Sequence, residues 1–393
     1  MNKRLTVLLV LILTICAIFA TMPTVASANQ QDNQTLTLLQ DFIANYPDRS
    51  YDLDDFTQVA IYVGEQFVKM GVASDNVVLQ EITGLPGQYN VVATIDNPNT
   101  TKTVVVGAHY DTAYGEGASD NACGVVALWQ IAQKLTQDAT QLPFDVQLVA
   151  FGCEEDGMDG SYYFVNSLTA KQKQDLLLMI NIDTIATGDN LYVFCENKAT
   201  PLQDAFIAGS QNSPVKLHSK PFNAGLFSTF DFYYFGYWEM AQNSDHTPFR
   251  LEGIPTAFFF SGNYNGKYYG YFESADKSKW VTNTPKDTLQ NLITNHPDFY
   301  QRVQTVVDTV CNTLQNPQNA TVIEDARNHL LPIGNKYWYY DYAPLIAFVI
   351  VAVVVVFGIS YYKKLKKKAI LGVAEVVNKQ VFTSPDADDI FKY

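Results

Sequence analysis

Hydrophobic residues along the chain are grouped in two ways that predict different secondary structure. Short, nearly continuous runs rich in Val, Ile, Leu and Phe are typical of buried strands. Strands are predicted at Val91–Ile95, Thr103–Val106, Val146–Phe151, Leu176–Ile182, Leu191–Cys195 and Thr256–Phe260. Apolar residues at helical spacing predict helices at Leu36–Ala44, Val59–Met70, about Asn121–Leu135 and Phe299–Leu314. The alternation of strands and helices indicates an α/β fold.

The apolar strand runs are continuous rather than alternating, as expected when helices cover both faces of a sheet. We therefore predict a three-layer α/β/α domain with a mixed, centrally parallel sheet. Residues 29–316 contain no internal repeat and no Ser/Gly-rich linker, so one such domain is expected to span them. In folds of this kind, ligands bind beyond the carboxyl ends of the strands.

Two further apolar runs lie outside that domain, and the first is at the start of the chain. Lys3 and Arg4 precede the apolar run Leu5–Ala20, and the small residues Ala26-Ser27-Ala28 follow it. This order is typical of a signal peptide over residues 1–28, so we expect the domain to be exported. An uncleaved N-terminal anchor is the alternative.

The second run, Tyr342–Tyr362, is long enough to cross the hydrocarbon core of a bilayer, which is roughly 30 Å thick. Five lysines lie between Lys363 and Lys368, a charge pattern that favours the cytoplasmic side of a membrane. We predict a single-pass protein of the cell membrane, with the domain outside, a polar stalk over residues 317–341 and a cytoplasmic tail over residues 363–393.

Charge and cysteine content narrow the possible functions. The formal net charge is −14 although the lysine cluster is included, so nucleic-acid binding is disfavoured. Five cysteines are too few to staple a domain of this size. A disulfide between Cys123 and Cys153 and a pair of buried thiols both remain open.

Several apolar runs end in side chains that commonly bind metals. These are His109, Asp120, Glu155 and Asp183, and an imidazole with several carboxylates suits zinc. Asp120 is the natural bridge between two ions because a carboxylate has two oxygens, and a helix N-cap is the less favoured alternative. Asp111 lies on the same side of an extended chain as His109, so we expect it to accept a hydrogen bond from the ring nitrogen that does not bind metal.

Glu154 and Glu155 are adjacent carboxylates after the strand Val146–Phe151. Like charges side by side raise each other's pKa unless a cation lies between them. One carboxylate can then bind metal while the other accepts a proton from water, which is the division that metal-assisted hydrolysis requires. An acidic pair on the surface is the simpler alternative.

A series of motifs connects these residues in one order along the chain. They are Tyr89-Asn90-Val91, Gly107–Asp111, Ser119–Gly124, Gly152–Glu155, Asn181–Asp183, Ser244–Phe249 and Gly253–Pro255. The series, from Tyr89 to Thr288, resembles the di-zinc aminopeptidase family that also contains glutaminyl cyclases and some carboxypeptidases. Each motif alone is weak evidence, whereas the ordered set is specific.

The resemblance assigns a role to each candidate residue. It implies that His109 and Asp183 bind one zinc, Asp120 bridges, and Glu155 binds a second zinc. Glu154 is then the general base and Asp111 orients His109. The resemblance also implies a cis peptide bond between Asp120 and Asn121.

The chain departs from the family at the last metal ligand. The family has a His where this chain has Asn283, within Asn283-Thr284-Pro285-Lys286-Asp287-Thr288. An amide oxygen is a poorer zinc donor than an imidazole nitrogen, so we expect a weakened second site formed by Asp120, Glu155 and Asn283. His246 and His296 are less convincing substitutes.

The function expected from these observations is a membrane-anchored zinc aminopeptidase that removes N-terminal residues from peptides with metal-activated water. Carboxypeptidase action is less favoured. Glutaminyl cyclisation is disfavoured because the zinc ligands of glutaminyl cyclases include the position that Asn283 occupies in this chain. A peptidase-like ectodomain that binds without catalysis is the alternative. An aromatic segment between Phe222 and Trp238 would either line a substrate pocket or pack in the core. Asn33, Asn99 and Asn319 lie in glycosylation-type sequons.

Overall fold

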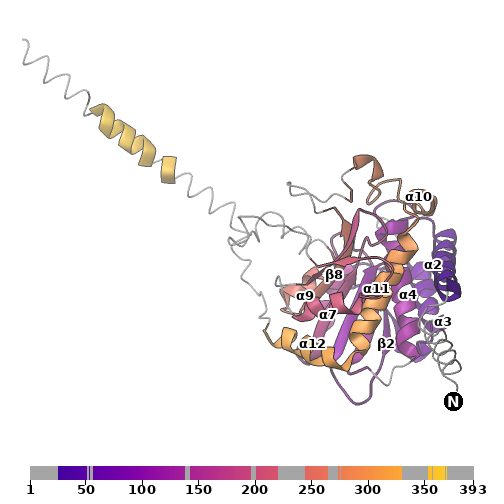
Figure 1. The fold of residues 1–393 in the computed structure, drawn as a ribbon. Helices are drawn as coiled ribbons and strands as arrows, with labels where there is room; N and C mark the ends of the chain where they lie inside the picture. Colours follow the sequence, from indigo (N-terminus) through magenta and orange to yellow (C-terminus); the bar gives the residue numbers. More distant parts are fainter. Residues whose placement is uncertain are drawn as a thin grey trace, which may run out of the picture. The chain divides into compact units, whose positions relative to one another are not determined.

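The computed structural model describes residues 25–50, 53, 56–137, 142–195, 201–219, 244–263, 273–274, 276–329, 353–355, 357–367 and 369. The chain divides into two compact units, residues 1–332 and 333–393. Figure 1 shows the first unit as a sheet with helices packed around it. Most of the predicted signal peptide lies outside the described residues, and the first described helix begins at Val25.

The first unit alternates strands and helices along most of its length. Its strands are β1 Val77–Glu81, β2 Tyr89–Ile95, β3 Thr103–His109, β4 Asp145–Phe151, β5 Leu176–Ile182, β6 Asn190–Cys195, β7 Leu217–His218 and β8 Thr256–Gly262. Its helices are α2 Val25–Asn45, α3 Thr57–Lys69, α4 Cys123–Thr136, α5 Asp159–Ser167, α6 Ala170–Asp175, α7 Pro201–Gly209, α9 Thr247–Leu251, α10 Leu289–Asn295, α11 Phe299–Gln315 and α12 Pro317–His329. Short helical turns occur at Ser74–Asn76, Ala118–Ala122 and Lys277–Lys279.

The eight strands form one sheet in the order β1-β2-β4-β3-β5-β8-β6-β7. The four central strands β4, β3, β5 and β8 are parallel to one another. β2 pairs antiparallel with β4, and β6 pairs antiparallel with β8. The predicted α/β fold with a mixed, centrally parallel sheet is therefore confirmed.

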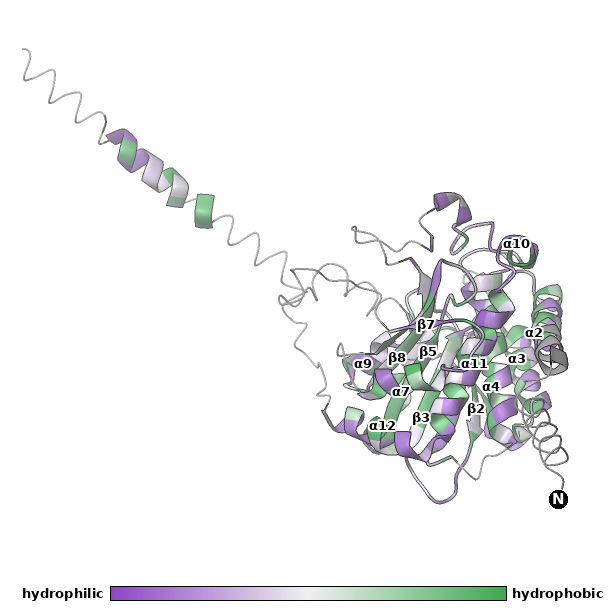
Figure 2. Cartoon of the chain, viewed as in Figure 1, coloured by the Kyte–Doolittle hydropathy of each residue, from purple (hydrophilic) through white to green (hydrophobic). Residues whose placement is uncertain are grey.

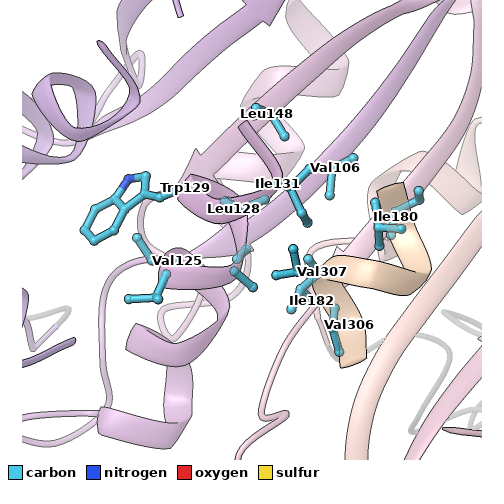
Figure 3. Close-up of a cluster of buried hydrophobic side chains, with 14 of the residues drawn as sticks. Val106, Val125, Leu128, Trp129, Ile131, Leu148, Ile180, Ile182, Val306 and Val307 are labelled. Atoms are coloured by element: carbon cyan, nitrogen blue, oxygen red, sulfur yellow. The ribbon is translucent and has the colours of Figure 1, made fainter. Parts of the chain in front are cut away.

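Helices cover both faces of the sheet, which explains why the central strands are apolar without interruption. Val104 and Val106 of β3 pack in the larger core with α4 and α11. Val105 points to the opposite face, where it packs with α5 and α9. Figure 3 shows part of the larger core, with Val106, Leu128 and Val307 among its labelled side chains. Figure 2 shows the same central strands as mostly hydrophobic.

The segment predicted as the start of a stalk is instead part of this unit. Residues 317–329 form α12, and Ile323 on that helix is fully buried in the larger core. Arg327 donates hydrogen bonds to the carbonyls of Leu176 (3.0 Å), Gly253 (2.9 Å) and Lys173 (3.2 Å). Ile323 and Arg327 therefore dock an otherwise polar helix on the first unit.

The second unit is described over residues 353–355, 357–367 and 369, and these are helical. Val354, Phe357 and Ile359 are among the exposed apolar side chains there. Within the residues that the structure describes, no helix has the length and apolar character needed to cross a bilayer. Residues 342–352 and 356 of the predicted span lie outside the described residues.

Candidate metal centre

The carboxyl ends of three adjacent strands bring the candidate residues to one edge of the sheet. β3 lies between β4 and β5 and is parallel to both. His109 is the last residue of β3, and Asp183 follows β5 directly. Glu154 and Glu155 lie in the loop that leaves β4. Since parallel strands end at the same edge, residues far apart in the sequence become neighbours.

Two overlapping groups of side chains at this edge could each hold a metal ion. The first is His109, Asp120 and Asp183, and the second is His109, Glu154 and Glu155, with the potential ligand atoms of each group within 4.8 Å of one another. The Nε2 atom of His109 lies 3.1 Å from Oδ1 of Asp120 and 3.3 Å from Oδ1 of Asp183. The predicted convergence of these side chains is therefore present in the fold.

Asp120 lies in the kinked turn Ala118–Ala122, which precedes α4. The N-cap of α4 is Ala122, so Asp120 is not a helix cap. The peptide bond between Asp120 and Asn121 is cis, as the family resemblance implies. The side-chain amide of Asn121 donates to the carbonyl of Ile182 (2.9 Å), which ties the turn to the end of β5 beside Asp183.

Asp287 holds the turn from the other side and was not predicted as a site residue. One of its carboxylate oxygens accepts the backbone N–H of Ser119 (2.7 Å), and the other accepts the backbone N–H of Asp120 (2.9 Å). Asp287 is buried, so these two bonds are shielded from water. The sequence motif around Asn283 contains Asp287, but its partners are too distant in sequence to be recognised.

Asp111 contacts His109 differently from the sequence-based prediction. The Nδ1 atom of His109 lies 3.1 Å from the backbone carbonyl oxygen of Asp111 and 3.6 Å from its carboxylate. The carboxylate instead accepts the backbone N–H groups of Glu154 and Glu155, each at 3.1 Å. The side chain of Asp111 thus fixes the glutamate loop, while its main chain fixes the imidazole. This division arises because β3 and β4 end side by side.

Asp183 is oriented by a chain of polar side chains from its own motif and from the Ser244–Phe249 motif. The hydroxyl of Ser244 donates to Oδ2 of Asp183 (2.7 Å), and the amide of Asn181 donates to the hydroxyl of Ser244 (2.7 Å). Both motifs were recognised in the sequence, but no role was predicted for Ser244 or Asn181. Their hydrogen bonds leave Oδ1 of Asp183 directed toward His109.

The electrostatics of the cluster fit a divalent cation. Burial raises the pKa of Asp120 to about 6, while burial and the charge of Asp120 raise that of Glu155 to about 9. Burial also raises the pKa of Glu154 well above its ordinary value. Burial opposes protonation of His109, but the charges of Asp183 and Glu154 raise the pKa of its imidazole well above the ordinary value. A cation among these carboxylates would relieve their mutual repulsion, so the donor set suits zinc.

The remaining candidate ligands are not members of these two groups. Asn283 is exposed and has a φ of 55°, and the described residues offer its side chain no hydrogen bond. Its turn is nonetheless tied to the Asp120 turn through Asp287. The ring of His246 stacks on Phe258 with centroids 4.5 Å apart. His296 is half-buried after α10, in neither metal-binding group.

The other sequence predictions near the site have mixed outcomes. Cys123 and Cys153 are buried and carry free thiols, so the disulfide considered between them is not formed. The aromatic segment between Phe222 and Trp238 lies outside the described residues. Its contribution to a substrate pocket stays a prediction.

Comparison with known proteins now identifies the family. Residues 90–309 match Peptidase family M28, a span that includes every predicted site residue from His109 to Asn283. The chain belongs to peptidase family M28. This M28 chain is 26% identical over 262 residues to a probable lipoprotein aminopeptidase, LpqL, of Mycobacterium tuberculosis, covering 62% of the chain and 49% of that protein. It is 29% identical to an aminopeptidase of Pseudomonas aeruginosa, over 44% of the chain and 31% of that protein.

Solved structures share the fold of this M28 chain. LapA of Legionella pneumophila is 18% identical with a TM-score of 0.54, over 72% of this chain and 73% of that one. A glutaminyl cyclase of Porphyromonas gingivalis is 19% identical with a TM-score of 0.51, over 72% of this chain and 97% of that one. The chain spans about half or less of the length of the two curated relatives above.

Proposed function

We propose that this chain is a zinc-dependent aminopeptidase. The observation that carries the proposal is the convergence of His109, Asp120 and Asp183 with Glu154 and Glu155 at one edge of the sheet. Membership of peptidase family M28 supports peptide hydrolysis, and curated relatives named as aminopeptidases support action at the N-terminus. An acidic site also attracts the cationic N-terminus of a peptide.

The chain's own residues divide the work of hydrolysis. Zinc bound by His109, Asp120, Asp183 and Glu155 would polarise the scissile carbonyl and make water more acidic. Glu154 accepts the proton of the attacking water and passes it to the leaving amine, a role favoured by the raised pKa of its carboxyl, which burial causes. The backbone N–H of Glu154 donates a hydrogen bond to the carboxylate of Asp111, which keeps Glu154 at the site.

Glu154→Gln tests the assigned base. The amide cannot accept a proton, so hydrolysis of an aminoacyl arylamide is expected to fall by about 10²–10⁴-fold, the usual contribution of a general base. Zinc content by elemental analysis should stay at the wild-type level. Asp156→Asn is the matched control, because Asp156 is an exposed acid in the same loop. Unchanged turnover of Glu154→Gln would show that another group is the base.

Asn283 favours one competing function, a peptidase-like ectodomain that binds peptides without cleaving them. Asn283 stands where the family has a His, so the site with Asp120 and Glu155 lacks an imidazole. The Asn283 side chain is also exposed. Asn283→His, analysed beside Glu154→Gln, separates the two functions. A gain in both zinc and turnover supports the aminopeptidase with a weakened second site. Absence of hydrolysis in wild type and in Asn283→His supports the binding function.

The proposal also includes membrane anchoring with the peptidase outside the cell. It is supported by the apolar run Tyr342–Tyr362 and by the lysines that follow it. The apolar run Leu5–Ala20, near the start of the chain, supports export. Peptides in the extracytoplasmic space are then the substrates.

A further inference from the structure

Arg49 is a fully buried cation beside the metal centre, and it lies outside the span 90–309 that matches the family. Its guanidinium packs over the ring of Phe42, 4.5 Å from the ring centroid. Three of its nitrogens each donate to a main-chain carbonyl: Nε to Tyr110 (2.8 Å), Nη1 to Tyr46 (3.0 Å) and Nη2 to Gly117 (3.2 Å). One rigid planar group therefore joins three separate chain segments.

Two of these carbonyls belong to the segments that deliver metal ligands. Tyr110 lies between His109 and Asp111, at the end of β3. Gly117 precedes the turn that carries Asp120. The main chain of Arg49 adds a further tie, because its carbonyl accepts the N–H of Thr112 (2.9 Å). His109 and Asp120, whose Nε2 and Oδ1 atoms lie 3.1 Å apart, thus belong to two segments held by the same guanidinium.

The positive charge of Arg49 also interacts with the carboxylates near the metal centre. Burial lowers the pKa of its guanidinium to about 10, which leaves it protonated at neutral pH. Asp287 and Asp111 are the acidic groups that most favour its charge. In the described part of the chain Arg49 forms no salt bridge with either. The cation is therefore fixed by carbonyl oxygens and acts on the carboxylates from a distance.

We infer that Arg49 is a positioning residue for the metal centre, because its guanidinium sets the spacing between the His109 strand end and the Asp120 turn. This inference rests on the proposed zinc-dependent function. It concerns a residue supplied by the segment between α2 and α3, so the N-terminal part of the unit helps to complete the site.

Arg49→Lys separates geometry from charge. Lysine keeps the positive charge but has one nitrogen, so it cannot hold three carbonyls in a plane. The full-length protein is titrated with Zn²⁺ against a chromophoric chelator, and kcat and KM are measured on an aminoacyl arylamide. Zinc affinity is expected to fall about tenfold or more, as for other residues that orient metal ligands. Arg49→Gln, which is neutral and shorter, should change in the same direction and serves if the lysine variant does not fold.

Arg327→Lys is the matched control. Arg327 also donates to three main-chain carbonyls, but those of Lys173, Leu176 and Gly253. Leu176 begins β5, at the end opposite Asp183, and Lys173 lies in α6, which precedes that end. Its substitution should lower the unfolding temperature while zinc affinity stays close to wild type.

The outcomes distinguish a failure of the positioning role of Arg49 from a failure of the proposed function. Weaker zinc binding in Arg49→Lys than in Arg327→Lys, at a temperature where both are folded, supports the positioning role. Equal zinc affinity in the two variants, in a chain whose wild type binds zinc and hydrolyses substrate, overturns the role of Arg49 alone. A wild type that binds no zinc overturns the proposed function and this inference with it.

Discussion

Asp111 and Asp287 are buried carboxylates that hold the site in place through backbone N–H groups. Asp111 accepts from Glu154 and Glu155, and Asp287 accepts from Ser119 and Asp120. Both acids thus order a loop that carries metal ligands.

Replacing Asp287 by Asn should loosen the Asp120 turn. The side-chain amide keeps one acceptor oxygen, but its NH₂ group must face one of the two backbone N–H groups. We expect a loss of about 1–3 kcal/mol in the free energy of unfolding, measured by chemical denaturation. Zinc affinity should weaken as well because the position of Asp120 depends on these bonds.

Asp276→Asn is the control for this substitution. Asp276 also accepts a backbone N–H, that of Ser278 at 3.0 Å, but it is exposed. Zinc affinity should be unaffected there. If Asp287→Asn were as stable and bound zinc as well as Asp276→Asn, the two hydrogen bonds of Asp287 would have no part in ordering the turn.

The sequence was sufficient to predict which acids meet His109, but not what holds them there. His109, Asp120 and Asp183 each end an apolar run or lie in a distinctive motif, so their types and places were informative. The role of Asp111 was only half predicted, because the partner of its carboxylate is set by strand adjacency. Asp287 and Arg49 were missed because their partners are main-chain groups, which leave no mark in the residue types.

The predicted strands were those with long apolar runs. β1 was not predicted because it lies at the sheet edge and none of its residues is fully buried. β7 has only two residues, too few to give a pattern. α5 and α9 are short helices covering the second face, and their apolar residues are too few for a clear helical period. For the strands, burial on both faces was therefore what made an element predictable.

α12 provides a test of the boundary between the domain and the C-terminal segment. Ile323 is fully buried, whereas the neighbouring Thr321 is exposed. Ile323→Ala should reduce the free energy of unfolding by about 2–5 kcal/mol, as for other buried aliphatic residues cut to Ala. Thr321→Ala should have little effect in the same denaturation experiment. Equal stabilities would mean that α12 does not pack on the domain in solution and that the stalk begins at residue 317.

The whole molecule combines a folded peptidase-like unit with a C-terminal segment whose role is best tested in cells. We expect the full-length chain to stay with membranes after alkaline carbonate extraction. Deletion of residues 342–362 should release it, because that run is the proposed anchor. The double substitution of Lys363 and Lys364 by Ala is a control that keeps the apolar run. Recovery of the full-length chain in the soluble fraction would contradict anchoring through this segment.

The strands that carry the ligands lie in the sheet in the order β4-β3-β5, which differs from their order along the chain. β3 becomes a central strand only when β4 and β5 flank it, and β5 is the last of the three to be synthesised. A nascent chain that ends before Leu176 contains the imidazole and the glutamate pair but lacks Asp183. The group His109, Asp120 and Asp183 is therefore complete only in a chain that extends past β5.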